Sequence, residues 1–330
     1  MKIIVTGATG FLGKYLVNEL LANNHQVVAI GRNFERLAEL KALGAEVLAI
    51  DLTNRNKVLE LMPTADVVIH AAARSTVYGR WQDFYRDNVL ASEYVLEACQ
   101  KMTIKRLVFV SSPSIYTAKE DRFDIKEDEY EVENKLNNYI RSKIAAERRL
   151  QALKADTELV IVRPRGLFGV GDTSIFPRLL RANGTIGIPL FKRKQPTIVD
   201  VTCVENVAYS LRLCCEAKAI DGEVFNITNG EPMVFKDIIE RIFRQLGDEV
   251  NFRSMNIRLM YGLAAILERT YQLFRIKNEP ALTRYTVCTL AYSQTLNIQN
   301  AVDKLGYQPQ KTMAQGIDDY ARHLIQEGFK

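Results

Sequence analysis

The 330-residue sequence has few of the residues that build metal sites and disulfide frameworks. It has five cysteines, an odd number without a Cys-x-x-Cys spacing, and only three histidines, at positions 25, 70 and 323. These counts indicate neither a disulfide framework nor a zinc or other histidine-ligated metal site.

Long apolar runs are also missing from the sequence. The longest charge-free apolar stretch is 259–267, which is far shorter than the roughly 20 residues that cross a bilayer as a helix. The chain starts Met-Lys-Ile-Ile-Val-Thr-Gly, and a short apolar run before a glycine predicts a strand and a turn rather than a signal peptide. We therefore expect a soluble, cytoplasmic protein.

The sequence also lacks a strong excess of charge of one sign. The formal net charge is +5, with 47% hydrophobic and 25% charged residues, a composition typical of globular proteins. The basic excess is too small and too dispersed to indicate a nucleic-acid partner.

The first half of the chain alternates short Val- and Ile-rich runs with amphipathic segments. Continuous apolar runs of this length predict strands buried on both faces of a parallel sheet. The predicted strands are 3–5, 27–30, 47–50, 67–69, 107–110 and 159–162. Their alternation with helices predicts an α/β, Rossmann-type doubly wound sheet.

After position 163 the pattern loosens, and it returns at 197–201, 204–216 and 224–227, segments that we expect to rejoin the sheet. We therefore assign 1–163 and 197–228 to a dinucleotide-binding domain. The segments 164–196 and 229–330 would form a smaller, interrupted substrate domain.

A glycine-rich turn follows the first predicted strand, in the sequence Thr-Gly-Ala-Thr-Gly-Phe-Leu-Gly. Gly7 permits the tight turn, Gly10 lets the backbone approach a pyrophosphate, and Gly13 lets the helix pack on the strand. The helix that begins here presents free N–H groups and a positive dipole end to phosphate. Its place between a strand and a helix predicts a dinucleotide site.

The second predicted strand ends in Gly31-Arg32-Asn33, without the carboxylate that usually holds the ribose of NAD. Arg32 is suited to a 2′-phosphate, so NADP(H) is favoured over NAD(H), although Arg32 stacking on adenine would suit either cofactor. Asp51 and Leu52, at the end of the third strand, are candidates for the adenine contact. Asp51 serves equally well as a helix N-terminal residue.

Tyr139 and Lys143 are spaced by four in a helical segment, so they share one face. An ammonium group near a tyrosine favours the phenolate and lowers the tyrosine pKa. Ser112, next to Pro113 at the end of the fifth strand, is our candidate for orienting a substrate carbonyl. These three residues are the predicted catalytic set.

These motifs resemble those of the extended short-chain dehydrogenases/reductases over nearly the whole chain. The shared motifs are TGATGFLG, HAAARS, the Asn88-Val89 helix start, VSSPSIY and YIRSK. Later stretches resemble the 3β-hydroxysteroid dehydrogenase/isomerase-like branch, namely 163–172, 199–208, 225–232, 279–284 and 305–309.

The resemblance implies the same catalytic set and a wider set of cofactor residues. The cofactor set is Gly7, Thr9, Gly10, Phe11, Leu12, Gly13, Arg32, Asp51, Leu52, Ala71, Ala72, Ala73, Asn88, Tyr139 and Lys143. The resemblance also implies a homodimer that forms through helices at about 83–100 and 137–154.

Two positions depart from related patterns. Nucleotide-sugar epimerases and dehydratases usually carry an asparagine where this chain has Gly166, which argues against a sugar nucleotide. Arg165 is unusual for the steroid-like branch, and the sequence does not assign its role.

Segment 255–274 is helical in period, rich in large apolar residues and flanked by basic ones. It is either a core-packing helix or the wall of an apolar substrate pocket that also contacts a membrane surface through 255–277.

We predict an NAD(P)-dependent oxidoreductase acting on a secondary alcohol or ketone of a small apolar, steroid-like or lipid-like substrate. The alternatives are a nucleotide-sugar epimerase or dehydratase that retains its NAD, and a non-catalytic dinucleotide-sensing or structural protein.

Overall fold

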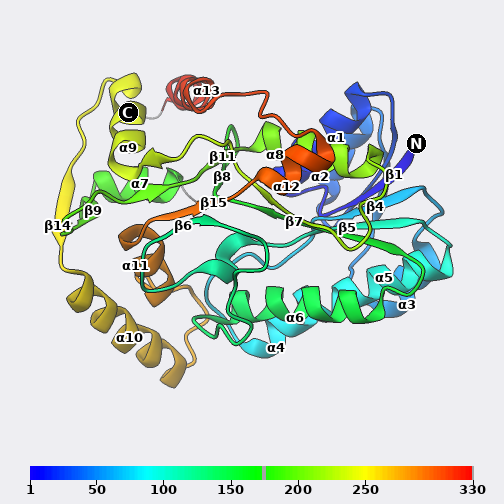
Figure 1. Cartoon of the computed structure of the whole chain (residues 1–330), viewed down its shortest axis with the longest axis horizontal. Helices are drawn as coiled ribbons and strands as arrows, with labels where there is room; N and C mark the ends of the chain where they lie inside the picture. Colours follow the sequence, from blue (N-terminus) through cyan, green and yellow to red (C-terminus); the bar gives the residue numbers. More distant parts are fainter. Residues whose placement is uncertain (173–175, 329–330) are drawn as a thin grey trace.

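The computed structural model describes residues 1–172 and 176–328 and is built around one large parallel sheet (Figure 1). The seven strands run in the order β12-β7-β5-β4-β1-β2-β3, and every pair is parallel. Their bounds are β1 Lys2–Thr6, β2 Gln26–Gly31, β3 Glu46–Ala49, β4 Val67–His70, β5 Arg106–Val110, β7 Glu158–Pro164 and β12 Val224–Ile227. The predicted doubly wound sheet is confirmed.

Helices cover both faces of this sheet. One face carries α1 (Phe11–Ala22), α2 (Phe34–Ala42), α8 (Val204–Glu216) and α12 (Gln299–Leu305). The other carries α3 (Arg55–Leu61), α5 (Ala91–Lys101) and α6 (Asn138–Leu153), with α4 (Trp81–Phe84) and a π-helical turn, Tyr85–Leu90, leading into α5.

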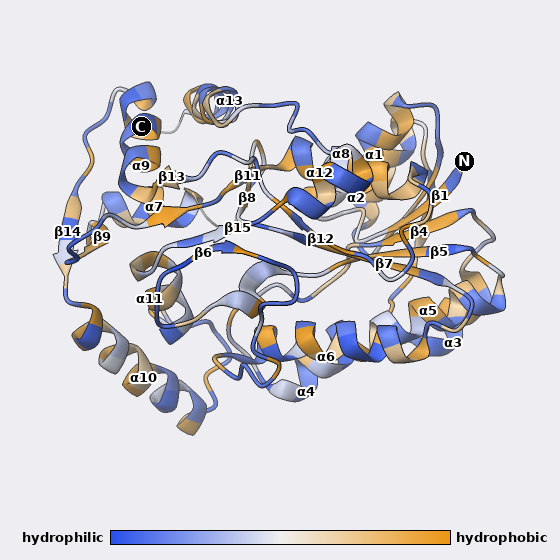
Figure 2. Cartoon of the chain, in the orientation of Figure 1, coloured by the Kyte–Doolittle hydropathy of each residue, from blue (hydrophilic) through white to orange (hydrophobic). Residues whose placement is uncertain are grey.

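The central strands β1, β4 and β5 are mostly apolar and buried because both faces of the sheet are covered (Figure 2). In β1, Ile3 and Val5 pack into the core under α1 and α8, whereas Ile4 between them packs into the core under α5 and α6. All three side chains are fully buried. The period of two along a strand therefore sends consecutive residues to opposite cores.

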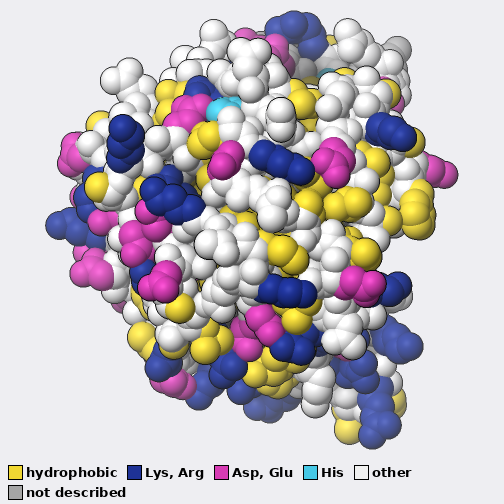
Figure 3. All heavy atoms as spheres, turned by 90° about the vertical axis from the view of Figure 1, so that its right-hand side faces the viewer, with side chains coloured by type: hydrophobic (Ala, Val, Ile, Leu, Met, Phe, Trp, Pro, Cys, Tyr) yellow, Lys and Arg dark blue, Asp and Glu magenta, His cyan; other side chains and the backbone are white. Residues whose placement is uncertain are grey.

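Helices α5 and α6 contact one another along the lower face in Figure 1. They lie within the two segments expected to form the dimer interface, and homodimerisation stays a prediction. On the face turned to the viewer in Figure 3, basic and acidic side chains are interspersed, as the small net charge implies.

The second layer consists of small sheets and the C-terminal helices. One sheet has the order β13-β10-β15-β6, and two pairs are β11-β8 and β14-β9. The strands are β6 Arg122–Ile125, β8 Leu167–Phe168, β9 Ile188–Phe191, β10 Ile198–Val199, β11 Thr202–Cys203, β13 Met233–Val234, β14 Phe252–Met255 and β15 Gln294–Leu296. The helices are α7 Phe176–Asn183, α9 Phe235–Leu246, α10 Ile257–Leu273, α11 Arg284–Ala291 and α13 Met313–Gln326.

One predicted strand lies in a different sheet from the one that the sequence predicts. Segment 197–201 does not rejoin the main sheet, because its two strand residues, Ile198 and Val199, pair with β13 and β15. The main-sheet position beside β7 is filled by β12 instead. Segments 204–216 and 224–227 do return to the main sheet, as α8 and β12.

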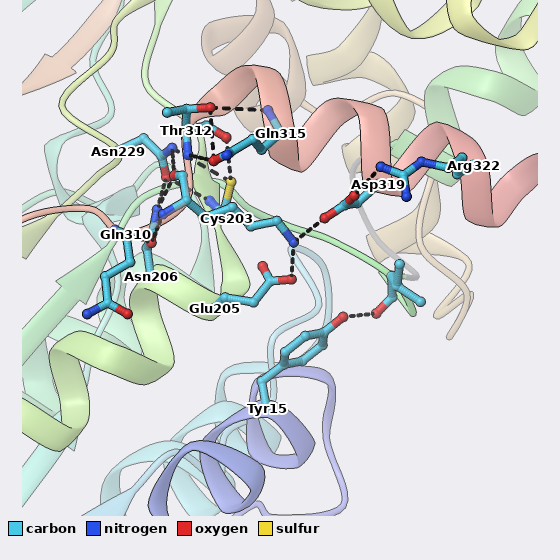
Figure 4. A network of polar contacts seen from close by, with 12 residues as sticks. Tyr15, Cys203, Glu205, Asn206, Asn229, Gln310, Thr312, Gln315, Asp319 and Arg322 are labelled. Carbon is cyan, nitrogen blue, oxygen red and sulfur yellow. Dashed lines mark hydrogen bonds and ion pairs between the residues drawn. The ribbon is translucent and has the colours of Figure 1, made fainter. Parts of the chain in front are cut away.

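A polar network joins the C-terminal segment to α8, which covers the main sheet (Figure 4). Lys311 forms ion pairs with Glu205 of α8, at 2.7 Å, and with Asp319 of α13, at 2.6 Å. The Asn206 amide donates to the Lys311 carbonyl at 2.7 Å. Helix α12 also packs against β12 although it lies within 229–330. The division of the chain into two domains stays a prediction.

Helix α10 lies at the edge of the molecule and is covered on one side only (Figure 1). Met260, Tyr261 and Ala264 pack with α11. Its other side exposes large apolar residues, namely Leu259, Leu263, Ile266 and Leu273, which are followed by Phe274. No helix in 1–172 or 176–328 is both long and apolar enough to cross a membrane.

Candidate active site

The turn after β1 has the geometry that the glycine motif predicts. Gly7 has φ +71°, and a Cβ there would lie 2.7 Å from the Ala72 backbone nitrogen. A Cβ on Gly13 would lie 2.3 Å from the Gly7 carbonyl oxygen. Only glycine fits either position. Because Gly7 and Gly13 have no side chain, β1, α1 and the end of β4 can come close together and leave a turn that is open to a phosphate.

A cavity of about 490 Å³ opens above this turn. Nine predicted cofactor residues line it: Gly7, Thr9, Gly10, Arg32, Asp51, Leu52, Ala71, Ala72 and Ala73. They come from the C-terminal ends of β1 to β4, the edge at which open α/β sheets bind ligands. The volume lies in the range of small-molecule sites. The residues present therefore fit an adenine dinucleotide.

The remaining predicted cofactor residues do not line this cavity. Gly13 is a packing residue, and Leu12 packs against the core. Phe11 contacts Tyr15 edge to face. Asn88 is buried, and its side-chain amide donates to the Arg74 carbonyl and the Ser142 hydroxyl. Asn88 thus positions the loop after β4 from outside the cavity. Tyr139 and Lys143 lie on α6.

Thr53, Arg74, Arg86 and Asp87 also line the cavity, and sequence reasoning missed them. The Asp87 carboxylate accepts from both arginines, at 2.8 Å from Arg74 and 2.6 Å from Arg86. Arg74 directly follows the three alanines of the HAAARS motif, which was a usable signal. Arg86 and Thr53 stand in segments without a motif.

The Arg32 side chain is exposed at the cavity wall and forms no hydrogen bond or ion pair with the described residues. Arg36 instead donates to the Thr9 carbonyl at 2.7 Å, so it braces the glycine turn. Asp51 lines the cavity, and it accepts the Thr53 backbone N–H at 3.0 Å, a bond that lowers the Asp51 pKa. The alternative interpretation of Asp51 as a helix N-terminal residue is wrong, because α3 begins at Arg55 and is capped by Asn54.

The structure brings the predicted catalytic residues to one place. Ser112 follows β5 and caps the short 3₁₀ helix Pro113–Tyr116, where its hydroxyl accepts the Ser114 N–H at 3.2 Å. Ser112 also acts on Tyr139, because it lowers the Tyr139 pKa against the effect of burial. Lys143, one turn further along α6, donates to the Val110 carbonyl at 3.0 Å. Ser112, Tyr139 and Lys143 thus meet where β5 ends.

The expected lowering of the Tyr139 pKa by Lys143 is wrong for this structure. Burial raises the pKa of Tyr139 to about 12, against an opposing effect of Ser112. Burial also lowers the pKa of Lys143 to about 8, and Glu147 partly counteracts that shift. Desolvation disfavours the charged form of each group, so it outweighs the pairing that the spacing suggested.

A buried ion pair sets the position of α6. Glu147 lies one turn after Lys143, and its carboxylate accepts two hydrogen bonds from Arg163 of β7, at 2.5 and 3.0 Å. The Ser111 hydroxyl donates to the same carboxylate. The pair therefore joins α6 to β7, and the bond from Ser111 joins α6 to the segment that follows β5.

Tyr285 of α11 is a further residue of this site that sequence reasoning missed. Its hydroxyl lies 2.9 Å from the Ser114 hydroxyl, which lies 2.9 Å from that of Ser112. Tyr285 also acts electrostatically on Tyr139. The contact spans 171 residues of sequence, and no motif marks Tyr285, so no local signal announced it.

The doubly wound sheet, with its cavity above the glycine turn, places the chain among the Rossmann-type nucleotide-binding proteins. A family model described as the NAD dependent epimerase/dehydratase family matches residues 3–228, and the chain belongs to this family. It is a family of NAD-dependent enzymes, and the predicted extended short-chain dehydrogenase/reductase type is confirmed.

Similar proteins extend over nearly the full chain. The uncharacterized protein YbjS of Escherichia coli is 32% identical, with 99% of each chain covered. A 2-alkyl-3-oxoalkanoate reductase of Stenotrophomonas maltophilia is 31% identical, with 96% of this chain and 97% of the relative covered. A decarboxylating sterol-4-alpha-carboxylate 3-dehydrogenase of Dictyostelium discoideum is 26% identical, with 96% and 99% covered.

Among solved structures, the UDP-glucuronic acid 4-epimerase of Bacillus cereus in complex with NAD superposes with a TM-score of 0.76. It is 22% identical, and the comparison covers 100% of both chains. At this identity the similarity shows the shared fold.

The buried Lys143 should reduce the stability of the cofactor-free protein. Its pKa falls from 10.5 unfolded to about 8 folded, so the penalty is fully present below pH 8 and disappears between pH 8 and 10.5. That shift corresponds to about 3 kcal/mol, and losing the bond to Val110 offsets about 1 kcal/mol. Lys143→Met should therefore stabilise the protein by about 2 kcal/mol at pH 7.

Denaturant unfolding from pH 7 to 10.5 measures this difference. The difference in free energy of unfolding between Lys143→Met and wild type should narrow above pH 8. The exposed Lys57→Met is the matched control and should change little at any pH. A Lys143→Met protein that is less stable than wild type at pH 7 would show that the ammonium group is well compensated.

Proposed function

We propose that this protein is an NAD(P)-dependent oxidoreductase that interconverts a ketone and a secondary alcohol on an apolar substrate. The observation that carries the proposal is the meeting of Ser112, Tyr139 and Lys143 at the end of β5, where Lys143 donates to the Val110 carbonyl. The nicotinamide, when bound, supplies or accepts the hydride. The chain's own residues must then bind the substrate oxygen and move its proton.

Each residue has a role that follows from its position. Tyr139, with a pKa of about 12, carries its proton at neutral pH and is suited to donating it to a carbonyl oxygen. Ser112 orients that oxygen by a second hydrogen bond. Lys143, which donates to the Val110 carbonyl, would hold the nicotinamide ribose when the cofactor is bound. The protonated tyrosine favours ketone reduction at neutral pH.

The named relatives support this class of substrate. Both of their names describe a carboxylate on the carbon next to the one that is reduced or oxidised, in a 3-oxoalkanoate and in a sterol 4-carboxylate with a 3-hydroxyl. Both substrates are otherwise largely apolar. We propose an acid of this kind, lipid-like or steroid-like, for this chain.

The nucleotide-sugar alternative is less well supported by the loop after β7. Gly166 has φ +53°, and a Cβ there would meet the Val201 side chain at 3.1 Å and the Asp200 carbonyl at 3.2 Å. An asparagine at this position would need both a strained backbone and space that Val201 fills. The non-catalytic alternative does not explain why Ser112, Tyr139 and Lys143 lie together at the end of β5.

Tyr139→Phe should lower kcat for reduction of a 2-alkyl-3-oxoalkanoate by about 10²–10⁴-fold, because the proton donor is removed. The measurement is steady-state oxidation of NADPH or NADH followed by absorbance. Tyr94→Phe on α5 is the matched control and should retain wild-type turnover. Equal turnover by Tyr139→Phe and wild type would refute the assigned role of Tyr139.

We propose NADP(H) as the preferred cofactor because Arg32 is unpaired at the cavity wall where the second strand ends. Arg32→Ala should weaken NADPH binding about tenfold or more and leave NADH binding nearly unchanged, since only NADPH carries the 2′-phosphate. Calorimetric titration of both proteins with both cofactors measures this. NADH binding as tight as NADPH in wild type would contradict the preference, and a co-purified, non-exchanging NAD would favour the epimerase alternative.

We also propose that α10 contacts an anionic membrane surface. Its outer side combines the exposed apolar residues with exposed basic ones, namely Arg258, Arg269, Arg275 and Lys277. The acidic Glu268 is buried and paired with Arg284, so it does not offset them. Apolar area with basic flanks is the pattern of interfacial helices.

Co-sedimentation with phosphatidylglycerol-containing vesicles tests this contact. Ile266→Ser with Leu273→Ser should weaken binding by at least about tenfold, because two large apolar side chains leave the lipid. Leu61→Ser with Ile325→Ser, which changes two exposed apolar residues elsewhere, is the matched control. Wild-type protein that stays in solution with these vesicles would refute the proposal.

A further inference from the structure

Two arginines stand at the end of β7, and only one of them is paired. Arg163 is 1% exposed and forms the ion pair with Glu147. Arg165 is 6% exposed, yet its guanidinium forms no hydrogen bond or ion pair with any residue of 1–172 or 176–328. Its Nε is fully enclosed without a partner, whereas its two terminal nitrogens are not enclosed.

The backbone of Arg165 is firmly held. Its N–H donates to the Ile227 carbonyl at 2.9 Å, and its own carbonyl accepts the Thr202 hydroxyl. The side chain is therefore unpaired although the surrounding chain is well ordered by hydrogen bonds. A buried charge without a partner lowers the stability of the fold. We therefore look for a group that could pair with Arg165.

Asp200 compensates Arg165 only in part. Its charge acts on Arg165, but the two side chains form no ion pair, and Asp200 Oδ2 instead accepts the Leu296 N–H at 2.7 Å. Burial raises the pKa of Asp200 to about 6. The Arg165 guanidinium can therefore bind another anion, one that forms hydrogen bonds with its terminal nitrogens, as Asp200 does not.

Arg165 also belongs to the surroundings of the catalytic residues. Tyr285 acts electrostatically on both Arg165 and Tyr139. The Tyr285 hydroxyl is hydrogen-bonded to Ser114, and Ser114 to Ser112. An anion at Arg165 would therefore sit close to the hydroxyl groups that would hold the reacting oxygen.

We propose that the Arg165 guanidinium binds a carboxylate that the substrate carries on the carbon next to its reacting carbonyl carbon. A planar guanidinium matches a carboxylate with two parallel hydrogen bonds. The site then selects a 3-oxo acid, or the corresponding 3-hydroxy acid, over a neutral ketone. This inference rests on the proposed function and assigns a role to Arg165, which the sequence analysis left without one.

The test compares a 2-alkyl-3-oxoalkanoate with its methyl ester, which keeps the shape and removes the charge. Wild type should prefer the acid by about 100-fold in kcat/KM, because the ester leaves the buried guanidinium unpaired. Arg165→Met should lose this preference through a higher KM for the acid, whereas ester reduction should not become slower, because the unpaired guanidinium is gone. Arg165→Lys should keep part of it. Equal use of acid and ester by wild type, or an equal loss for both in Arg165→Met, would overturn the inference.

Stability separates ligand binding from a structural role. Arg165→Met removes an unpaired buried charge and should unfold at the same temperature as wild type or higher. Arg163→Met is the matched control and should unfold at a lower temperature, because it leaves Glu147 unpaired. A comparable loss of stability in Arg165→Met would mean that Arg165 is a structural counter-ion of Asp200.

A binding measurement keeps the inference testable if neither substrate is reduced. Calorimetric titration with 2-hexyldecanoate, which has the carboxylate but no oxo group, should show binding that weakens at least about tenfold in Arg165→Met. That result with no turnover would remove the proposed function and retain the carboxylate site. Equal binding by both proteins would remove the carboxylate site itself.

Discussion

The catalytic geometry of this protein depends on the buried ion pair between Arg163 and Glu147. Both side chains are about 1% exposed, and removing two charges from water is tolerated only when their remaining hydrogen bonds are satisfied. Here Arg163 also donates to the Tyr116 hydroxyl at 2.5 Å and to the Glu127 carbonyl at 2.6 Å. The pair fixes the rotation of α6 about its axis, and that rotation decides where Tyr139 and Lys143 point.

The two halves of the site are built in different ways. The cofactor cavity is formed by the ends of β1 to β4, so its shape follows from the sheet and from glycines that allow close backbone contact. The catalytic half joins β5, α6 and α11, which meet through buried polar contacts. Burial is the common cause of its properties. It raises the pKa of Tyr139 and lowers the pKa of Lys143. It also encloses the Arg165 Nε without a hydrogen-bond partner.

The second layer brings the remaining chemistry to the same edge of the sheet. Helix α11 carries Tyr285 to Ser114, and α10 packs on α11 with its other side exposed. The proposed membrane contact of α10 and the proposed carboxylate site at Arg165 would both suit an amphipathic acid as substrate.

The sequence by itself determined the sheet and the glycine turn and pointed to Ser112, Tyr139 and Lys143 as a catalytic set, because each of these depends on local patterns. Apolar runs of four or five residues can form only buried strands here, and Gly7 and Gly13 are required by backbone contacts with near neighbours in the fold. The tertiary structure alone decided the place of β10, the pairing of Arg163, the isolation of Arg165 and the contact of Tyr285. These depend on which distant segments meet, and on desolvation, which reversed the expected direction of the Tyr139 pKa. A residue's spacing gives its face on a helix, but its charge state follows from everything that surrounds it.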